Sequence, residues 1–542
     1  MATENQKPKT DNRLFHIITF GCKVNQCDTA GMARELTGLG WCAAAPGAEP
    51  DLVIVNTCTV TKRADQQARQ AIRRLAREHP ETPIWVTGCY GQRAPAEVAA
   101  LPGVQAVFGN QEKAALAHLL SDYPGHLLLL CPGSILQIPA PIPETVVGAV
   151  REPPLRKPPE KVKNIFARYI GDATLGEADS PSPLMGEGWG GGEPSNPPPP
   201  SPLPPGEGEG EIAAKKSLNA GEPAPGVWVG DFAAAPGFQP WEVHQTPGHT
   251  RAWLKIQEGC NHQCRYCIVP RVRGPRRSQE PAAVLAAFHQ LAGLGYREVV
   301  LTGVDLGQYG LDHAPPASLA ALVRRLAAQA WPFRVRLSSL EPMMVTPELL
   351  DELAAWEDFC PHFHLPLQSG AAPVLAAMGR PYGPEEFRDL VREISRRFPG
   401  AGLGLDVLVG FPGESDADFE ATRSLVAELP VTYLHVFPYS PRPGTPAADL
   451  PPLPGNVVQA RARIMRELGQ AQKKKFLEAQ LGQIREVLVE GPAEREGWLK
   501  GLSDHYLRVT FPGPPARRNR RIMVYLRARQ GEVLVGEAIG EP

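Results

Sequence analysis

The sequence predicts an α/β protein with three folded parts: an N-terminal parallel α/β sheet domain, a central partial α/β barrel and a C-terminal small β-barrel. Two observations lead to this prediction. From Leu14 to Asn110, and again after Cys267, short β-branched runs alternate with helical patterns, which is typical of parallel sheets covered by helices. Near the end of the chain, four strand-like runs follow one another with only turns between them, which favours a small β-barrel.

Length and composition limit the classes of protein. A chain of 542 residues exceeds what one hydrophobic core supports, so several domains are expected. The formal net charge of -2 excludes gross attraction to polyanions, so any binding of nucleic acid must use local patches. No run of about eighteen apolar residues occurs, and the first residues are polar, so we expect a cytoplasmic protein without a membrane span. The ten cysteines are too sparse for a disulfide scaffold and suit metal ligands or buried thiols.

In the N-terminal sheet, three cysteines follow predicted strands. Cys22 follows HIITFG, Cys58 follows DLVIVNT and Cys89 follows PIWVTG. Ligands collect at the carboxyl ends of parallel strands, so we expect the three thiols at one edge, where they could hold an iron–sulfur cluster. The alternative is three separate buried thiols. The remaining cysteines outside the central loop have no such position and are interpreted as ordinary thiols: Cys27, Cys42, Cys131 and Cys360.

The segment 131–226 lacks the periodicity of its flanks. Residues 181–210 contain 18 Pro or Gly in 30, and PSPLMGEG is echoed by PSPLPPGEG. Such a composition buries too little apolar surface to offset chain entropy, so we predict a disordered insert. The alternative is a proline-rich ligand for a partner domain.

A second group of three thiols opens the central domain. Cys260, Cys264 and Cys267 have the spacing CxxxCxxC and lie on one loop after an apolar segment. Three thiolates can hold three irons of a 4Fe–4S cluster, and the fourth iron then stays open to a substrate. A structural zinc site is the alternative, but zinc usually takes four ligands in CxxC pairs, and no second CxxC exists. His262 could be a fourth ligand, with poor geometry.

Further candidate residues follow the central strands. The pattern repeats about six times after Cys267, which suits a partial α/β barrel, and barrel active sites lie at the carboxyl ends of strands. The polar or glycine residues at these positions are Thr302, Gly303, Asp305, Ser338, Ser339, Glu341, Gln368, Ser369, Gly410, Glu414, Tyr439 and Arg442.

The C-terminal runs QIREVLVE, YLRVTF, RIMVYLRA and EVLVGEAI follow a long helix predicted from about Asn456 to Gln480. Basic residues gather there, and such a patch on a small barrel suits backbone phosphates, although a solvated basic face is the alternative. They are Lys473, Lys474, Lys475, Arg517, Arg518, Arg520, Arg521, Arg527 and Arg529.

These motifs together resemble the radical S-adenosylmethionine methylthiotransferases. The N-terminal motifs are TFGCKVNQCD, VNTCTV and TGCY, and the central ones are LKIQEGCNHQCRYCIVPRVRG, LTGVDLGQYG, RVRLSSLEP, HLPLQSG, MGRPY, DVLVGFPGES and HVFPYSPRPGTPAA. The C-terminal barrel is similar to a TRAM domain, an RNA-binding module. The expected domains are 13–125 with an auxiliary cluster, the insert 131–226, the radical SAM domain 246–475 and the TRAM-like barrel 476–542.

The resemblance implies two 4Fe–4S clusters and S-adenosylmethionine as cofactors. Cys260, Cys264 and Cys267 would hold the cluster that reductively cleaves S-adenosylmethionine. The auxiliary cluster on Cys22, Cys58 and Cys89 would supply sulfur, which a second S-adenosylmethionine methylates. The implied substrates of the family are isopentenyladenosine in tRNA, threonylcarbamoyladenosine in tRNA and an aspartate of a small-subunit ribosomal protein. LTGVDLGQYG and LHVFPYSPRPGTPAA resemble the threonylcarbamoyladenosine branch most.

The resemblance also assigns cofactor contacts. Gly303 and Gly307 would let the backbone approach the methionyl end, although a plain turn is the alternative. Tyr266 belongs to the cluster signature. The expected adenine contacts are Leu408, Gly410 and Glu414, and the expected ribose and carboxylate contacts are Ser338, Glu341, Gln368 and Arg380. A surface salt bridge is the alternative for Arg380.

Four arginines near the cluster loop could contact tRNA phosphates, or could form a solvated charge run: Arg271, Arg273, Arg276 and Arg277. Residues 276–279 read RRSQ where the family tends to have ERSR, which puts their contacts in doubt.

The partners implied are the anticodon stem-loop of a tRNA, a reductant such as flavodoxin or ferredoxin, and a sulfur source, with the enzyme acting as a monomer away from membranes. Two rival classes are an iron–sulfur electron carrier and a zinc-stapled RNA-binding protein. An electron carrier normally completes each cluster with a fourth cysteine, which both groups lack.

Overall fold

The computed structural model describes residues 13–122, 226–230, 232, 237–241 and 249–539. They divide into two compact units. Of the unit 118–179, only residues 118–122 are described, and they form most of helix α5; the other unit holds the remaining elements below. The predicted disordered insert lies outside the described residues, apart from Gly226.

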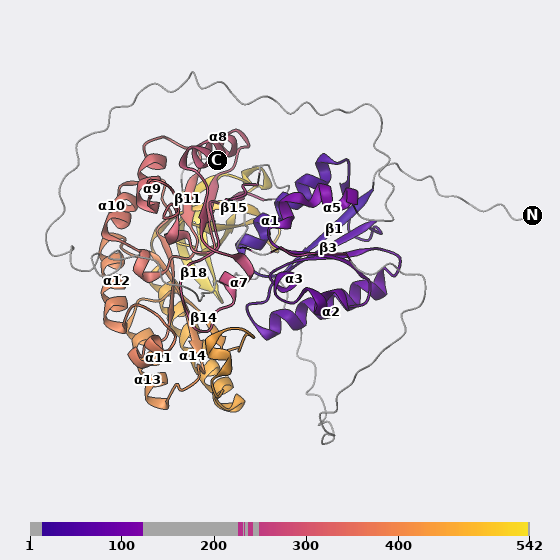
Figure 1. Ribbon diagram of the computed structural model, residues 1–542. Helices are drawn as coiled ribbons and strands as arrows, with labels where there is room; N and C mark the ends of the chain where they lie inside the picture. Colours follow the sequence, from indigo (N-terminus) through magenta and orange to yellow (C-terminus); the bar gives the residue numbers. More distant parts are fainter. Residues whose placement is uncertain (1–12, 123–225, 231, 233–236, 242–248, 540–542) are drawn as a thin grey trace, which may run out of the picture. The chain divides into compact units, whose positions relative to one another are not determined.

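The N-terminal domain is a six-stranded parallel sheet in the order β2-β1-β3-β4-β5-β6. Helices α1 and α2 cover opposite faces of the sheet (Figure 1). The central strands β3 and β4 are buried along their whole length, as expected for apolar runs with helices on both faces. The bounds are β1 Leu14–Thr19, α1 Lys23–Gly38, β2 Cys42–Ala43, β3 Leu52–Thr57, α2 Lys62–Glu78, β4 Ile84–Gly88, α3 Cys89–Arg93, α4 Pro95–Ala99, β5 Val104–Phe108, α5 Leu116–Asp122 and β6 Gly226–Trp228.

Helix α1 begins five residues earlier than the sequence indicates. The residue pattern after LFHIITF predicts a helix from about Asp28, and aspartate is a favoured N-cap residue, but the N-cap is Cys22. Asp28 is instead buried and forms ion pairs with Lys113 at 2.8 Å and Lys255 at 2.7 Å. Tertiary charge pairing therefore overrides the local capping preference.

The central domain contains six parallel strands in two three-stranded sheets, ordered β11-β10-β7 and β12-β13-β14. A parallel bridge between Val335 and Phe359 lies beside β11. This is the predicted partial barrel, and its helices α8, α9, α10 and α12 lie outside the strands (Figure 1). The strands are β7 Arg251–Lys255, β10 Glu298–Thr302, β11 Arg334–Leu337, β12 His362–Gln368, β13 Gly402–Val409 and β14 Tyr433–Pro438.

The helices of this domain are α7 Val269–Arg273, α8 Pro281–Gly293, α9 Leu319–Ala327, α10 Pro347–Ala355, α11 Ala372–Ala377, α12 Pro384–Arg397, α13 Asp416–Glu428 and α14 Gly455–Ala479. The sequence analysis missed α10, although Thr346 caps it by accepting a hydrogen bond from the Leu349 N–H at 3.1 Å. Phe288 of α8 and Leu322 of α9 share one buried core with Leu301 of β10. A short ribbon of β8 (Gln257–Glu258) and β9 (Arg277–Ser278) brackets the cluster loop.

The C-terminal domain is a closed five-stranded barrel in the order β15-β16-β17-β19-β18. Its strands are β15 Ile484–Pro492, β16 Trp498–Ser503, β17 Arg508–Pro512, β18 Arg521–Gln530 and β19 Val533–Ala538. The predicted small barrel is confirmed, with β16 as an additional strand. The segment of β16 has few β-branched residues, which explains why its sequence gave no strand signal.

The C-terminal barrel docks on the amino ends of the central strands. Glu298, the first residue of β10, pairs with Arg334 at 2.7 Å and Arg336 at 2.9 Å, and all three side chains are buried. The two guanidinium groups then donate to backbone carbonyls of β16 and the following turn: Leu502 at 2.8 Å, Ser503 at 3.0 Å and Asp504 at 2.9 Å. This contact leaves the carboxyl ends of the strands to the cluster loop.

The N-terminal domain meets the partial barrel at the carboxyl ends of its two edge strands. Lys255, the last residue of β7, contacts Asp28. Arg442, which follows β14, forms a buried ion pair with Asp65 of α2 at 2.5 Å. No helix within the described ranges has the length and apolar character that a membrane crossing requires.

We predict that Glu298→Gln destabilises the protein by roughly 3–5 kcal/mol, because it removes the counter-charge of buried Arg336 and leaves buried Arg334 paired with the partly exposed Glu486. Burial alone would raise the pKa of Glu298, but Arg336 and Arg334 hold it well below its usual range. The stabilisation is therefore present above about pH 4.3, the unfolded value, and is lost as pH falls through the folded pKa. Urea unfolding of the full chain measures it.

The matched control for this prediction is Glu352→Gln, which breaks a partly exposed pair with Arg324. It should cost less than about 1 kcal/mol. Equal losses in the two variants would contradict the buried network.

Candidate functional site

The thiols of Cys22, Cys58 and Cys89 lie at one edge of the N-terminal sheet. They follow β1, β3 and β4, which are neighbours in the parallel sheet. All three line one cavity of about 170 Å³. Gly21 has a φ of 100°, and a Cβ there would lie 2.8 Å from the Cys58 Cβ, so this close approach requires glycine.

The three cysteines are half-buried or buried, and their sulfurs are supplied with N–H donors. Burial raises the pKa of the Cys22 thiol, while Arg273 and the N–H groups of Asn25 and Val24 lower it. Burial raises the pKa of Cys58 to about 12, although the hydrogen bond from the Val60 N–H acts to lower it. Without a metal these two thiols therefore stay protonated at neutral pH, and a metal would displace the protons.

Arg273 supplies the donor for the third sulfur. Its Nε lies 3.4 Å from the Cys89 Sγ, and its Nη1 contacts Asp28 at 3.0 Å and Glu258 at 2.7 Å. The side chain is 3% exposed, so the expected phosphate contact is wrong for Arg273. Its charge is satisfied inside the protein, between α1 and the cluster loop.

Cys260, Cys264 and Cys267 form the second buried triplet, on the loop after β8. The His262 N–H lies 3.5 Å from the Cys260 Sγ, and the Val269 N–H lies 3.3 Å from the Cys267 Sγ. Burial raises the pKa of both thiols well above the usual value. This loop therefore repeats the pattern of the first triplet, in which the donor comes two residues after the cysteine.

Arg380 and Glu341 lie beside Cys264, the remaining cysteine of this loop. The Arg380 Nη1 donates to the Cys264 Sγ at 3.1 Å, and its guanidinium forms a buried ion pair with Glu341. Tyr382 accepts a further hydrogen bond from the Arg380 Nη2 at 3.1 Å. The surface salt bridge considered for Arg380 is therefore excluded, and a direct contact of either residue with S-adenosylmethionine stays a prediction.

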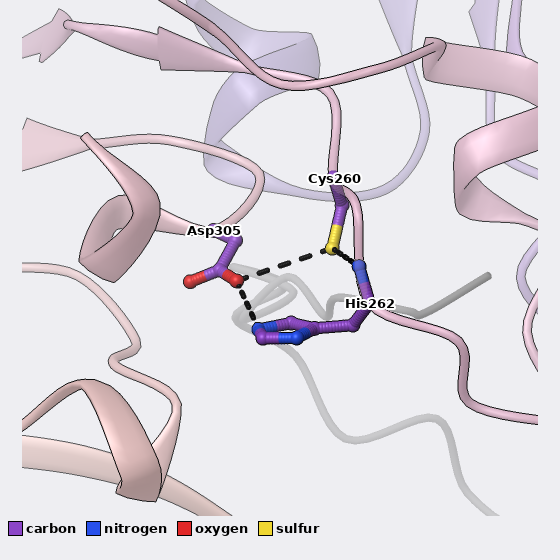
Figure 2. Close-up of side chains that lie close together, drawn as sticks. All are labelled: Cys260, His262 and Asp305. Carbon is purple, nitrogen blue, oxygen red and sulfur yellow. Dashed lines mark hydrogen bonds and ion pairs between the residues drawn. The ribbon is translucent and has the colours of Figure 1, made fainter. Parts of the chain in front are cut away.

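His262 turns toward Asp305 (Figure 2). Its Nε2 lies 2.7 Å from the Asp305 Oδ2, which also lies 3.9 Å from the Cys260 Sγ. Burial alone would lower the pKa of His262, but the hydrogen bond to Asp305 raises it. One thiol, one imidazole and one carboxylate could hold a metal ion, but this set would leave Cys264 and Cys267 unused.

A second, smaller cavity lies beside the Cys267 loop. Its wall contains the predicted cofactor residues Tyr266, Gln368 and Leu408. Gln368 adopts a φ of 64° at an irregularity in the register of β12, which is uncommon for a residue other than glycine. Such strain often marks functional positions, and contact with S-adenosylmethionine stays a prediction for all three.

The other predicted cofactor residues lie elsewhere. Gly303 and Ser338 line the larger cavity, with the N-terminal triplet. Gly307 packs against Met344, since a Cβ there would lie 2.4 Å from its Cβ.

Gly410 and Glu414 lie against α14. The Gly410 N–H donates to Glu414 at 2.8 Å, and Glu414 pairs with Arg461 at 2.6 Å. These contacts give both residues a structural role, and adenine contacts for them stay predictions.

The two cavities share part of one wall, formed by Val60, Thr61 and Phe437. The aromatic ring comes from β14, and the other two residues come from the segment after Cys58. The shared wall therefore borders both the cavity with Cys22, Cys58 and Cys89 and the cavity with Cys267.

The residues present fit iron–sulfur clusters and an organic cofactor. Each triplet offers three thiols, all free in the structure, with donors suited to thiolates; Cys22 and Cys58 are half-buried and the other four are buried. Three polar atoms near the cavities are buried without a hydrogen-bond partner among the described residues: Tyr266 Oη, Ser338 Oγ and Asp406 Oδ2. Such atoms are rare unless a ligand or water completes them.

The sequence analysis missed a polar cluster inside the partial barrel. His364 and His435 lie 2.8 Å and 3.1 Å from the same oxygen of Asp406, and the three come from β12, β14 and β13. Burial would raise the pKa of Asp406, but the two imidazoles hold it low. The available signal was one polar residue inside each apolar strand, in HFHLPL, LGLDVLVG and TYLHVFPY.

Comparison with known proteins identifies two domains. Residues 14–109 match the family model described as Uncharacterized protein family UPF0004, and residues 254–426 match the Radical SAM superfamily. The first match covers the N-terminal triplet, and the second covers the CxxxCxxC loop.

Similar proteins span nearly the whole chain. The threonylcarbamoyladenosine tRNA methylthiotransferase MtaB of Bacillus subtilis is 30% identical over 504 residues, which is 92% of this chain and 90% of that protein. The MtaB of Aquifex aeolicus is 31% identical over 474 residues, 87% of this chain and 92% of that protein. The tRNA-2-methylthio-N(6)-dimethylallyladenosine synthase of Pelotomaculum thermopropionicum is 30% identical over 510 residues, which is 93% of this chain and 92% of that protein.

The fold and the two triplets define an iron–sulfur enzyme that uses radical S-adenosylmethionine chemistry. The chain belongs to the radical S-adenosylmethionine methylthiotransferase family. It is a transferase whose cofactors are S-adenosylmethionine and two 4Fe–4S clusters. The relatives named MtaB agree with the branch that the motifs indicate.

We predict that Arg273→Gln makes the reduction potential of the auxiliary cluster more negative, because the variant loses an N–H donor and a positive charge beside Cys89. An EPR-monitored redox titration of the reconstituted full chain measures this. Arg276→Gln, on the same loop, should leave the potential unchanged, since the Arg276 side chain donates to the Leu311 carbonyl.

Arg273→Lys keeps the positive charge near Asp28 but removes the Nε donor to Cys89. This variant therefore separates the loss of the hydrogen bond to the cluster ligand from misfolding. A fully loaded Arg273→Gln protein with an unaltered potential would contradict the assigned role.

Proposed function

We propose that the protein adds a methylthio group to carbon 2 of N6-threonylcarbamoyladenosine next to the anticodon of tRNA. The observation that carries the proposal is the shared wall of the two cavities. Phe437, Val60 and Thr61 border both the cavity with Cys22, Cys58 and Cys89 and the cavity with Cys267. An adenine at this wall would have the hydrogen-abstracting centre on one side and the sulfur source on the other.

The assignment of groups follows from the two triplets. Cys260, Cys264 and Cys267 would hold the cluster that works with S-adenosylmethionine, and Cys22, Cys58 and Cys89 would hold the auxiliary cluster. When bound, these groups supply the radical chemistry and the sulfur that replacement of an unactivated C–H bond requires.

The protein's own residues orient the reactants and exclude water. Tyr266, Phe411 and Tyr439 pack edge to face near the smaller cavity, with ring centroids 6.3 Å and 5.5 Å apart. This aromatic wall keeps the reacting region dry, which protects a reactive species from side reactions. Gln368 and Leu408 border the same cavity and would orient S-adenosylmethionine there.

Two arguments support the threonylcarbamoyl branch. Relatives with that name include the proteins of Bacillus subtilis and Aquifex aeolicus. The wall of the larger cavity also carries polar groups, among them Lys23, Ser338 and His364. A polar substituent on the adenine suits this wall better than a dimethylallyl group, which would leave the buried Ser338 Oγ unpaired. The dimethylallyl substrate and a ribosomal protein are the alternatives that the test distinguishes.

The C-terminal barrel would bind the tRNA backbone. Arg527 and Arg529 lie on β18, and Arg517 and Arg518 lie next to its start. Arg527 pairs with Glu537 at 2.5 Å, Arg529 pairs with Glu478 of α14 at 3.5 Å, and Arg518 donates to the Glu490 carbonyl at 3.2 Å. These exposed pairs are weak and exchange readily for phosphate oxygens.

The first test is mass spectrometry of nucleosides from bulk tRNA of a strain lacking this gene. We expect 2-methylthio-N6-threonylcarbamoyladenosine to be absent, and to return with the wild-type gene but not with Cys58→Ala or Cys264→Ala. Loss of the methylthio-dimethylallyl nucleoside instead would overturn the substrate branch. No change in any tRNA nucleoside would redirect the proposal to the ribosomal protein.

The same two variants differ in a second measurement. Purified Cys58→Ala should still cleave S-adenosylmethionine under reducing conditions, because it alters only the auxiliary site. Cys264→Ala should not cleave it. Cleavage at the wild-type rate by Cys264→Ala would contradict the assignment of the two triplets.

A further inference from the structure

The cavity beside Cys22, Cys58 and Cys89 has a cationic wall. Among the described residues that line it are Lys23 and Arg273, and neither aspartate nor glutamate. Arg273 is engaged with Cys89, Asp28 and Glu258. The wall therefore favours an anionic group, and Lys23 is a second cation at this wall, separate from the ion pairs of Arg273.

Lys23 shares the cavity wall with residues of the partial barrel. It is half-buried at the start of α1. The same cavity is lined by Thr302, the last residue of β10, by Ser338, which follows β11, and by His364 of β12. The charge of Lys23 therefore stands at a wall to which both domains contribute.

Neutral polar groups accompany Lys23 on this wall. The Ser338 Oγ is buried and has no hydrogen-bond partner in the described part of the chain. His364 is held in place by Asp406 through Nε2 at 2.8 Å and by Tyr433 through Nδ1 at 3.1 Å. A buried hydroxyl without a partner is costly unless a ligand or water completes it. The wall is thus suited to a ligand that carries both a carboxylate and hydrogen-bonding groups.

We propose that Lys23 binds the carboxylate of the N6 substituent of the substrate adenosine, with Ser338 as a hydrogen-bonding neighbour. The cavity is then the subsite that distinguishes a threonylcarbamoyl group, which ends in a carboxylate, from an uncharged alkyl group. This inference rests on the proposed function and names the residue that sets its specificity. A charge-assisted hydrogen bond in a buried site provides both affinity and discrimination.

A different use of Lys23 is conceivable, because it follows the cluster ligand Cys22 directly. Its charge could serve the thiolates alone. In that case Lys23→Gln would alter the auxiliary cluster, and the effect on activity would not depend on the substituent of the substrate.

The decisive experiment uses reconstituted full-length enzyme and three anticodon stem-loops. They carry N6-threonylcarbamoyladenosine, its carboxamide analogue and N6-dimethylallyladenosine. For the wild-type enzyme, replacing the carboxylate by the carboxamide should raise KM about tenfold to a hundredfold. For Lys23→Gln, the two substrates should have the same raised KM, since the charge pair is already absent.

Lys62→Gln is the matched control, because Lys62 begins α2 just as Lys23 begins α1, and its side chain is exposed. This variant should keep the wild-type preference for the carboxylate. Iron content, the EPR spectrum of the auxiliary cluster and S-adenosylmethionine cleavage should be unchanged in Lys23→Gln. Lys23→Arg should restore part of the preference because it retains the charge.

The possible outcomes distinguish a failure of the proposed function from a failure of the role assigned to Lys23. If the wild-type enzyme modifies only the dimethylallyl stem-loop, the proposed function is wrong. If it modifies the threonylcarbamoyl stem-loop and its carboxamide with equal KM, the proposed function stands and the role of Lys23 is wrong. If Lys23→Gln loses the auxiliary cluster, the charge of Lys23 serves the thiolates, and its role in reading the carboxylate of the substrate is wrong.

Discussion

Six sulfurs, four of them on buried cysteines, depend on N–H hydrogen bonds, and the arrangement of the site follows from this need. Four of them take a backbone N–H from the residue two positions later: Cys22, Cys58, Cys260 and Cys267. The other two, Cys89 and Cys264, take a donor from a buried arginine. A thiolate in a low-dielectric interior is costly without such donors. Each triplet therefore requires local turns of the chain and one arginine from elsewhere in the fold.

The two arginines connect the cysteines to the architecture. Arg380 follows α11 and reaches the CxxxCxxC loop, whereas Arg273 crosses from the central domain to the N-terminal domain. The auxiliary site is thus complete only when both domains are assembled. The C-terminal barrel is fixed to the amino ends of the strands through Glu298, and the N-terminal domain contacts the carboxyl ends. This division leaves the cavities at the carboxyl ends, between the two triplets.

Much of this was accessible from sequence because apolar periodicity and cysteine spacing are local signals. The parallel sheet, the partial barrel and the two triplets were predicted in this way. The start of α1 was misjudged because Asp28 is paired with Lys113 and Lys255, which are distant in sequence. The burial of Arg273 was missed for the same reason, since its partners lie on α1 and on β8. Strand β6 follows the insert, so its pairing with β5 has no local signal.

Hyperfine spectroscopy of reduced, reconstituted enzyme with 15N-labelled arginine guanidinium groups tests the central claim most directly. The account predicts weak 15N couplings at both clusters, from Arg273 beside Cys89 and from Arg380 beside Cys264. The coupling at the auxiliary cluster should disappear in Arg273→Lys, while the other coupling remains. Absence of 15N coupling at both clusters in the wild-type enzyme would contradict the claim that arginine donors complete the two sites.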